Sequence, residues 1–106
     1  MATWEDVRRL AAGFEGAEES TVYTRPAFKV RGKSLAWMSP HEPGALVTRA
    51  DPDEVPLLIG SNPDLYFTTP HYQAYAMVLT RLEQATQDDL RERIEDSYDV
   101  ISGGSG

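Results

Sequence analysis

Cysteine is absent from all 106 residues of the chain. Thiol nucleophiles, cysteine-ligated zinc, iron–sulfur clusters and disulfide bridges are therefore excluded together. A chain of this length can be stabilised by one hydrophobic core without such cross-links. The sequence predicts a single domain over residues 1–101, in a reducing, cytoplasmic setting and without a cofactor.

Long hydrophobic runs are missing as well. No stretch of about 18 apolar residues occurs, which is the length that a membrane-spanning helix needs, so no membrane segment is expected. Residues 102–106 read Ser-Gly-Gly-Ser-Gly, which is the composition of a flexible linker or of the remnant of an engineered fusion. Whether the chain is natural or engineered therefore stays open.

Positive charge is scarce, because ten Lys and Arg stand against seventeen Asp and Glu and give a net charge of −7. This balance opposes non-specific attraction to nucleic acid, since proteins that bind polyanions usually carry a basic surplus. The charge is uneven, however. Residues 20–41 contain no acid and carry four cations, namely Arg25, Lys29, Arg31 and Lys33.

Hydrophobic periodicity predicts an α+β fold. Thr3 and Thr86 are candidate N-caps, each followed by acids in the first turn and by apolar residues at helical spacing. Between these helices the apolar residues alternate with a period of two, which is typical of strands. The expected order is α-β-β-β-β-α-β-β-α, an antiparallel sheet covered on one face by N- and C-terminal amphipathic helices.

The expected boundaries follow from the same patterns. A first strand should begin at Thr21, and further strands are expected at residues 27–30, 34–38, 45–49, 65–68 and 76–82, with a short helix over 51–59. The residues of the last helix that should face the core are Leu90, Ile94, Tyr98 and Ile101. Those expected on its solvated face are Arg91, Glu92, Arg93, Glu95 and Asp96.

The four cations lie around Arg31-Gly32, which is the predicted turn of a β-hairpin. Basic hairpins can contact phosphates, but exposed hairpins also carry Lys and Arg for solubility and to block edge pairing. Both interpretations remain open at this stage.

A second candidate site surrounds His71. Trp37, Tyr66, His71, Tyr72 and Tyr75 together could line a small-molecule pocket with one titratable group. The alternative is a histidine that anchors a loop, with tyrosines at the edge of the core. His41, between two prolines, is expected to be exposed in a turn.

Catalytic and metal motifs are not evident. No nucleophile is spaced with a base as in known triads, and two His without an acidic partner at i+3 or i+4 make a poor set of metal ligands. An enzyme is therefore the third hypothesis, with His71 as its general acid or base.

The chain also resembles a known family. Residues 25–33, Arg-Pro-Ala-Phe-Lys-Val-Arg-Gly-Lys, continue to Ala36-Trp37, and residues 67–72, Phe-Thr-Thr-Pro-His-Tyr, precede Val78-Leu79. These motifs, in this order, resemble the MmcQ/YjbR family, and the likeness extends over residues 3–101. The resemblance implies a frataxin-like α+β sandwich with hairpin wings and a DNA-binding role inferred from shape, but no catalytic residues.

Two functions are thus left in competition. The leading hypothesis is a non-enzymatic domain that binds DNA weakly and salt-dependently through Arg25, Lys29, Arg31 and Lys33. The alternative is a small-molecule-binding protein that uses the aromatic residues around His71. Neither hypothesis requires a metal or a membrane, and the identity of a ligand and the oligomeric state stay open.

Overall fold

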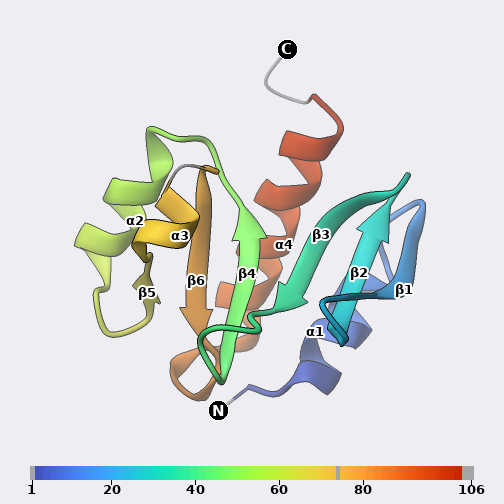
Figure 1. The fold of residues 1–106 in the computed structure, drawn as a ribbon, viewed down its shortest axis with the longest axis horizontal. Helices are drawn as coiled ribbons and strands as arrows, with labels where there is room; N and C mark the ends of the chain where they lie inside the picture. The colour runs from blue at the N-terminus through green and yellow to red at the C-terminus, as the bar shows by residue number, and fades with distance from the viewer. Residues whose placement is uncertain (1, 74, 104–106) are drawn as a thin grey trace.

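The computed structural model describes residues 2–73 and 75–103, so the predicted linker lies largely outside the described residues. Within them, antiparallel strands form one sheet in the order β1-β2-β3-β4-β6-β5 (Figure 1). The strands are β1 (Ala17–Val22), β2 (Arg25–Val30), β3 (Lys33–Met38), β4 (Ala45–Arg49), β5 (Tyr66–Phe67) and β6 (Met77–Arg81).

The helices are α1 (Trp4–Ala11), α2 (Glu54–Ser61), α3 (Pro70–Gln73) and α4 (Gln87–Ile101), and a 3₁₀ turn, η1, spans Leu82–Gln84. The predicted α+β class and element order are confirmed, with the short helix α3 added between the last two strands. No helix in the described part of the chain has both the length and the apolar character needed to cross a membrane.

The helices α1 and α4 cover one face of the sheet, and the main core lies beneath them (Figure 1). Because side chains alternate along a strand, Phe28, Leu46 and Val78 point towards the helices and pack in one cluster with Leu90 and Ile94. Burying each such side chain stabilises the fold by about 1.5–3 kcal/mol. The predicted core face of α4 is confirmed.

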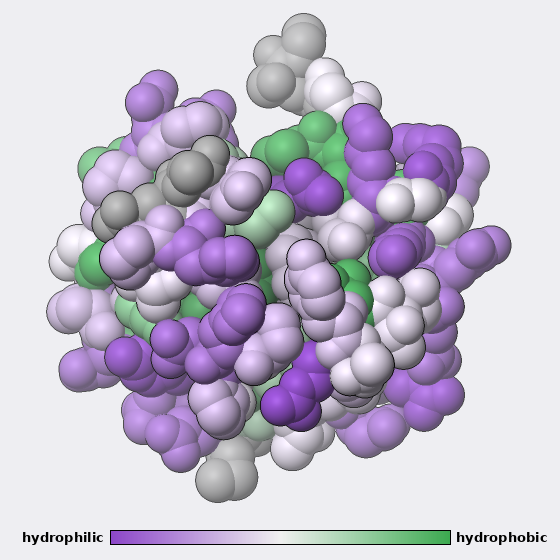
Figure 2. Space-filling view, viewed as in Figure 1, coloured by the Kyte–Doolittle hydropathy of each residue, from purple (hydrophilic) through white to green (hydrophobic). Residues whose placement is uncertain are grey.

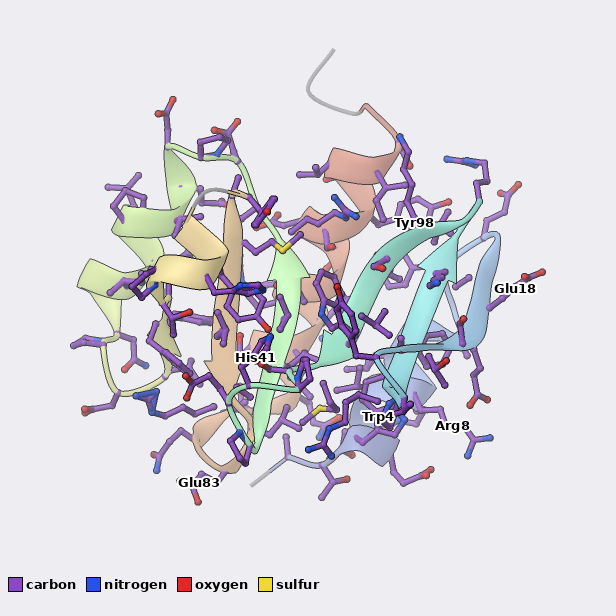
Figure 3. The ribbon with its side chains drawn as sticks, in the orientation of Figure 1. Trp4, Arg8, Glu18, His41, Glu83 and Tyr98 are labelled. Carbon is purple, nitrogen blue, oxygen red and sulfur yellow. The ribbon has the colours of Figure 1, made fainter. Side chains whose placement is uncertain are left out.

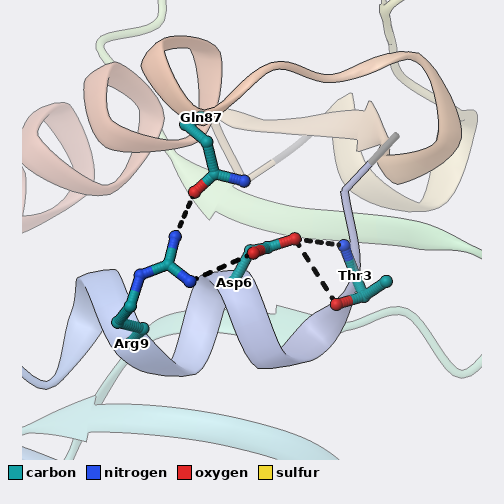
Figure 4. A network of polar contacts seen from close by, with 4 residues as sticks. All are labelled: Thr3, Asp6, Arg9 and Gln87. Carbon is teal, nitrogen blue, oxygen red and sulfur yellow. Dashed lines mark hydrogen bonds and ion pairs between the residues drawn. The ribbon is translucent and has the colours of Figure 1, made fainter.

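The ends of the long helices are held by local polar contacts. The Thr3 N–H donates to Asp6 Oδ2 at 2.9 Å, and Thr86 Oγ1 accepts from the Asp89 N–H at 3.1 Å, so both predicted N-caps are confirmed. The Arg9 guanidinium contacts Asp6 Oδ1 at 3.2 Å and also donates to the side-chain oxygen of Gln87 (Figure 4). This network ties the start of α4 to α1.

The first strand begins earlier than predicted, at Ala17 rather than Thr21. β1 is the outermost strand and pairs only with β2. Its residues 18–21 are all exposed, so they carry no alternation of apolar and polar side chains from which a strand could be recognised.

Arg93 was expected to be solvated, but its side chain is only 4% exposed. Its Nη2 lies 2.8 Å from Asp96 Oδ2, its Nη1 lies 3.8 Å from Glu54 Oε1, and the guanidinium lies 5.5 Å from the centre of the Tyr66 ring. The prediction was wrong because helical periodicity does not show that α2 and β5 fold over this part of α4.

The other face of the sheet, which we call the open face, is not covered by α1 or α4. A second cluster lies there, formed by Ala27, Trp37, Ala45, Val47 and Leu79 together with Tyr72 of α3. Seen from this side, the surface is largely polar, with small separate hydrophobic areas (Figure 2). The open face is therefore partly solvated, and it carries most residues of the predicted aromatic pocket together with Arg25 and Lys29.

Candidate functional site

A pocket of about 310 Å³ opens on the open face. Its lining residues come from segments far apart in the sequence: Val22, Tyr23, Trp37, Pro40, His41, His71, Tyr72, Tyr75 and Met77. Four of the five residues predicted for the aromatic pocket, namely Trp37, His71, Tyr72 and Tyr75, are thus brought together. The volume lies at the lower end of the range for small-molecule sites.

His71 lies among the rings of this pocket. Its ring centroid is 4.8 Å from that of Tyr72 and 4.7 Å from that of His41, and both pairs meet edge to face, as aromatic rings prefer. His41 was expected only to be an exposed turn residue. It is exposed, but it also adds a second imidazole to the site, over the open face of the sheet (Figure 3).

The loop that carries His41 is fastened to α3, which carries His71. The buried Tyr72 hydroxyl lies 2.8 Å from Ser39 Oγ. Ser39 Oγ also accepts from the backbone N–H groups of His41, at 3.2 Å, and Glu42, at 3.0 Å. Because one hydroxyl holds both segments, the backbone that carries His41 is fixed relative to α3 before any ligand arrives.

Two exposed tyrosines form the rim of the pocket. The Tyr23 side chain is 79% exposed and that of Tyr75 is 62% exposed. Tyr23 and Thr24 have φ values of 49° and 66°, and Ala76, beside Tyr75, has a φ of 53°. This left-handed region costs a non-glycine residue about 1–2 kcal/mol. Tyr23 and Thr24 adopt it as the two-residue turn between β1 and β2, whereas Ala76 is in no hairpin turn.

Tyr66 lies outside the pocket, contrary to the prediction. Strand alternation directs its neighbour Phe67 to the open face and Tyr66 to the opposite side. Tyr66 is buried in the main core beneath Arg93, and this burial raises the pKa of its hydroxyl group. It is a core residue with no access to the site.

The cations of the predicted hairpin follow the length of β2. Arg31 and Gly32 have φ values of 51° and 81°, and they form the predicted tight turn between β2 and β3. Arg25 and Lys29 share the open face with Ala27, because they alternate with residues that point to the core. Arg31 lies in the turn at the end of this strand, and Lys33 is directly opposite Val30, which points to the main core. The register therefore places Arg25 and Lys29 in a row on the open face, with Arg31 at its far end and Lys33 beside it on the other side of the hairpin.

These four cations form no ion pair within the described residues. Arg8, Arg9, Arg91 and Arg93, by contrast, each contact a carboxylate, at distances between 2.8 and 3.2 Å. The acids nearest to the row lie on β1. Glu18 is directly opposite Lys29 in the strand register, at the outer edge of the sheet (Figure 3), so the basic row is narrow.

Together these features define an α+β domain whose open sheet face carries an aromatic pocket and the cations Arg25 and Lys29, with Arg31 and Lys33 at the adjoining end of the β2–β3 hairpin. The sequence model of the YjbR family matches residues 12–100. The chain belongs to the YjbR family, and the resemblance noted in the sequence is confirmed.

The chain is also similar to individual proteins. Two relatives are each 34% identical to it over an alignment length of 115: the Uncharacterized protein Rv2570 of Mycobacterium tuberculosis and the Uncharacterized protein Mb2600 of Mycobacterium bovis. Each alignment covers 92% of this chain and 87% of the relative. The crystal structure of Deinococcus radiodurans protein DR2400, with the family-model domain DUF419, has a TM-score of 0.80 at 21% identity and covers 100% of this chain and 83% of that one. This likeness shows the fold alone.

Proposed function

We propose that this YjbR-family domain binds nucleic acid through the open face of its sheet and the adjoining end of the β2–β3 hairpin, with Arg25, Lys29, Arg31 and Lys33 in contact with phosphates. One observation supports this above all. These four cations have no carboxylate partner among the described residues, whereas the arginines of α1 and α4 do. Unpaired guanidinium and ammonium groups are the donors that phosphate oxygens accept from.

The expected binding is weak. The net charge of −7 and the carboxylate of Glu18 beside the row oppose the approach of a polyanion. Four phosphate contacts predict a log–log dependence of affinity on salt with a slope of about −3 to −4 on duplex DNA, and dissociation constants of about 1–100 μM are typical of such non-specific binding. Phosphate contacts carry no information on base sequence.

Fluorescence anisotropy of a labelled DNA duplex, titrated over a series of salt concentrations, tests the proposal. Reversing Arg31 and Lys33 to Glu should abolish binding to every duplex sequence alike. The single variant Arg31→Glu should weaken binding, and Arg91→Glu is its matched control. Both variants change the net charge equally, but Arg91 lies on α4. A slope near zero, or equal losses for Arg31→Glu and Arg91→Glu, would contradict the proposal.

Small-molecule binding is the second candidate, and the convergence of Trp37, His41, His71, Tyr72 and Tyr75 on one pocket favours it. A planar aromatic probe such as indole should shift the NMR signals of both imidazoles. Its affinity should be nearly independent of salt and should be lost in His71→Ala, which should leave duplex binding unchanged. If indole bound His71→Ala as tightly as it binds the wild type, a site in this pocket would be refuted.

A further inference from the structure

The aromatic pocket and the basic row lie on the same face of the sheet. From this arrangement we propose that the ligand of this surface is a single-stranded polynucleotide, with one unstacked base in the pocket and the flanking phosphates on Arg25 and Lys29. The inference rests on the proposed nucleic-acid binding and names the form of nucleic acid that the site accepts.

The first support is the position of Arg25 at the rim of the pocket. In the strand register Arg25 is directly opposite Val22, which lines the pocket. Cα atoms of opposed residues in antiparallel strands lie about 4.5–5.5 Å apart. Lys29 lies four residues further along the same face of β2. A backbone that follows β2 therefore passes directly beside the pocket.

The second support is the availability of aromatic surface. Trp37 and Tyr72 are buried and form the floor, whereas Tyr23 and Tyr75 are exposed at the rim. Every base has a flat face that can stack on such rings, regardless of sequence. The nitrogens of His41 and His71 can exchange hydrogen bonds with the edge of a base that has left its stack.

The third support is backbone strain at the rim. Tyr23 itself has a φ of 49°, and Tyr75 precedes Ala76, which has a φ of 53°. Both exposed rings are thus presented by backbone that L-residues rarely adopt. Tyr23 and Thr24 form the two-residue turn between β1 and β2, which itself accounts for their positive φ. Ala76 is in no such hairpin turn, and strained positions of this kind occur where a ligand is clamped.

A duplex fits this surface less well than a single strand. Paired bases cannot reach a pocket unless they are flipped out, which costs free energy that a strand with unpaired bases does not lose. Glu18 also limits the positive surface to the width of one row. A row of this width matches one phosphate backbone. Proteins commonly recognise single strands by combining aromatic side chains on a sheet face with nearby cations.

The test compares a short labelled oligothymidylate, an oligouridylate and the corresponding DNA duplex by fluorescence anisotropy at low salt, with the full chain. We expect one of the two single strands to bind at least about tenfold more tightly than the duplex, with a salt slope of about −3 for four contacts. The tighter single strand identifies the preferred sugar.

Variants at the rim test the base pocket itself. Tyr23→Ala and Tyr75→Ala should each weaken single-strand binding by about 5- to 100-fold, the range for the loss of one stacked base. Tyr23→Phe keeps the ring and should bind as the wild type does. Leu57→Ala is a control for loss of exposed apolar surface, because Leu57 is 71% exposed on α2, outside the lining of the pocket.

The outcomes separate this inference from the proposed function. Equal affinity for duplex and single strand, with no effect of either tyrosine substitution, would overturn the inference and leave phosphate binding in place. Absence of binding to all three probes at low salt would overturn both. Because both tyrosines are exposed, unchanged melting temperatures of the variants are expected and would show that any loss arises at the site.

Discussion

The hydroxyl group of Ser97 joins α4 to two strands of the sheet, and its removal should destabilise the domain. Ser97 is fully buried. Its Oγ donates to the carbonyl oxygen of Leu35 in β3 at 2.6 Å and accepts from the backbone N–H of Arg49 in β4 at 3.0 Å. Ser97→Ala keeps the helix and almost the same volume, but it removes the partner of both backbone groups.

The size of the effect follows from these two contacts. A buried polar group left without its partner costs about 1–3 kcal/mol, so two of them would cost about 2–6 kcal/mol. The lower part of that range, about 2–4 kcal/mol, is expected because the contact with the Arg49 N–H is only partly buried. The higher helix propensity of Ala offsets about 0.5 kcal/mol of that loss. The expected net loss in free energy of unfolding is about 1.5–3.5 kcal/mol, a large part of the 5–15 kcal/mol typical of a domain.

Urea denaturation followed by circular dichroism measures this loss directly, and thermal melting should show a decrease of roughly 7–16 °C for a domain of this length. Ser20→Ala is the matched control, since Ser20 is exposed on β1 and should tolerate the change within about 0.5 kcal/mol. If Ser97→Ala were as stable as Ser20→Ala, the hydroxyl would not be the connection that we describe.

Three further predictions concern other parts of the fold. Ile94→Ala should lower the free energy of unfolding by about 2–4 kcal/mol because the side chain is fully buried, and a neutral result in urea denaturation would mean that α4 packs through another face. Ala76→Gly should raise stability by about 0.5–1 kcal/mol because it relieves a positive φ; a lower urea midpoint would contradict this. Burial and a hydrogen bond with Asp96 raise the pKa of Glu54 in the folded state, so stability decreases as the pH rises from the unfolded value through the folded one. Glu54→Gln should therefore have the higher urea midpoint at pH 7, and the difference should vanish below about pH 4, where the carboxyl is protonated in both states. A lower midpoint for Glu54→Gln at pH 7 would show that the ion pair with Arg93 outweighs burial.

Local patterns in the sequence were sufficient for most of the fold. Thr3 and Thr86 were recognisable as N-caps because capping depends on residues three positions apart, and the core face of α4 follows from helical spacing. Arg93 and Ser97 were not predicted as buried. Arg93 stands three residues after Leu90, and Ser97 stands three residues after Ile94, so both lie on the side of α4 that faces the core. A polar residue at such a position is the signal from which its burial could have been predicted.

The candidate site could be predicted only in part, because it is assembled from distant segments. His71 and Tyr72 attracted attention as neighbours in a cluster of aromatic residues. His41 did not, because it lies thirty positions before His71, and the two are brought together by tertiary contacts such as that of Ser39 with Tyr72. Tyr66 was assigned to the site by proximity in sequence, although strand alternation places it on the opposite face.

The outer edge of β1 bears on self-association. An edge strand presents unpaired backbone groups to which a strand of another molecule can add, and this is a common start of aggregation. In β1 the exposed residues include Glu18 and Glu19, and Glu19 is paired with Arg8. An incoming second copy of this strand would therefore meet the carboxylate of Glu18, unpaired among the described residues, with its own. The opposite edge, β5, offers only two residues. Glu18, the acid that narrows the basic row, thus also discourages the sheet from extending, strand by strand, into a polymer.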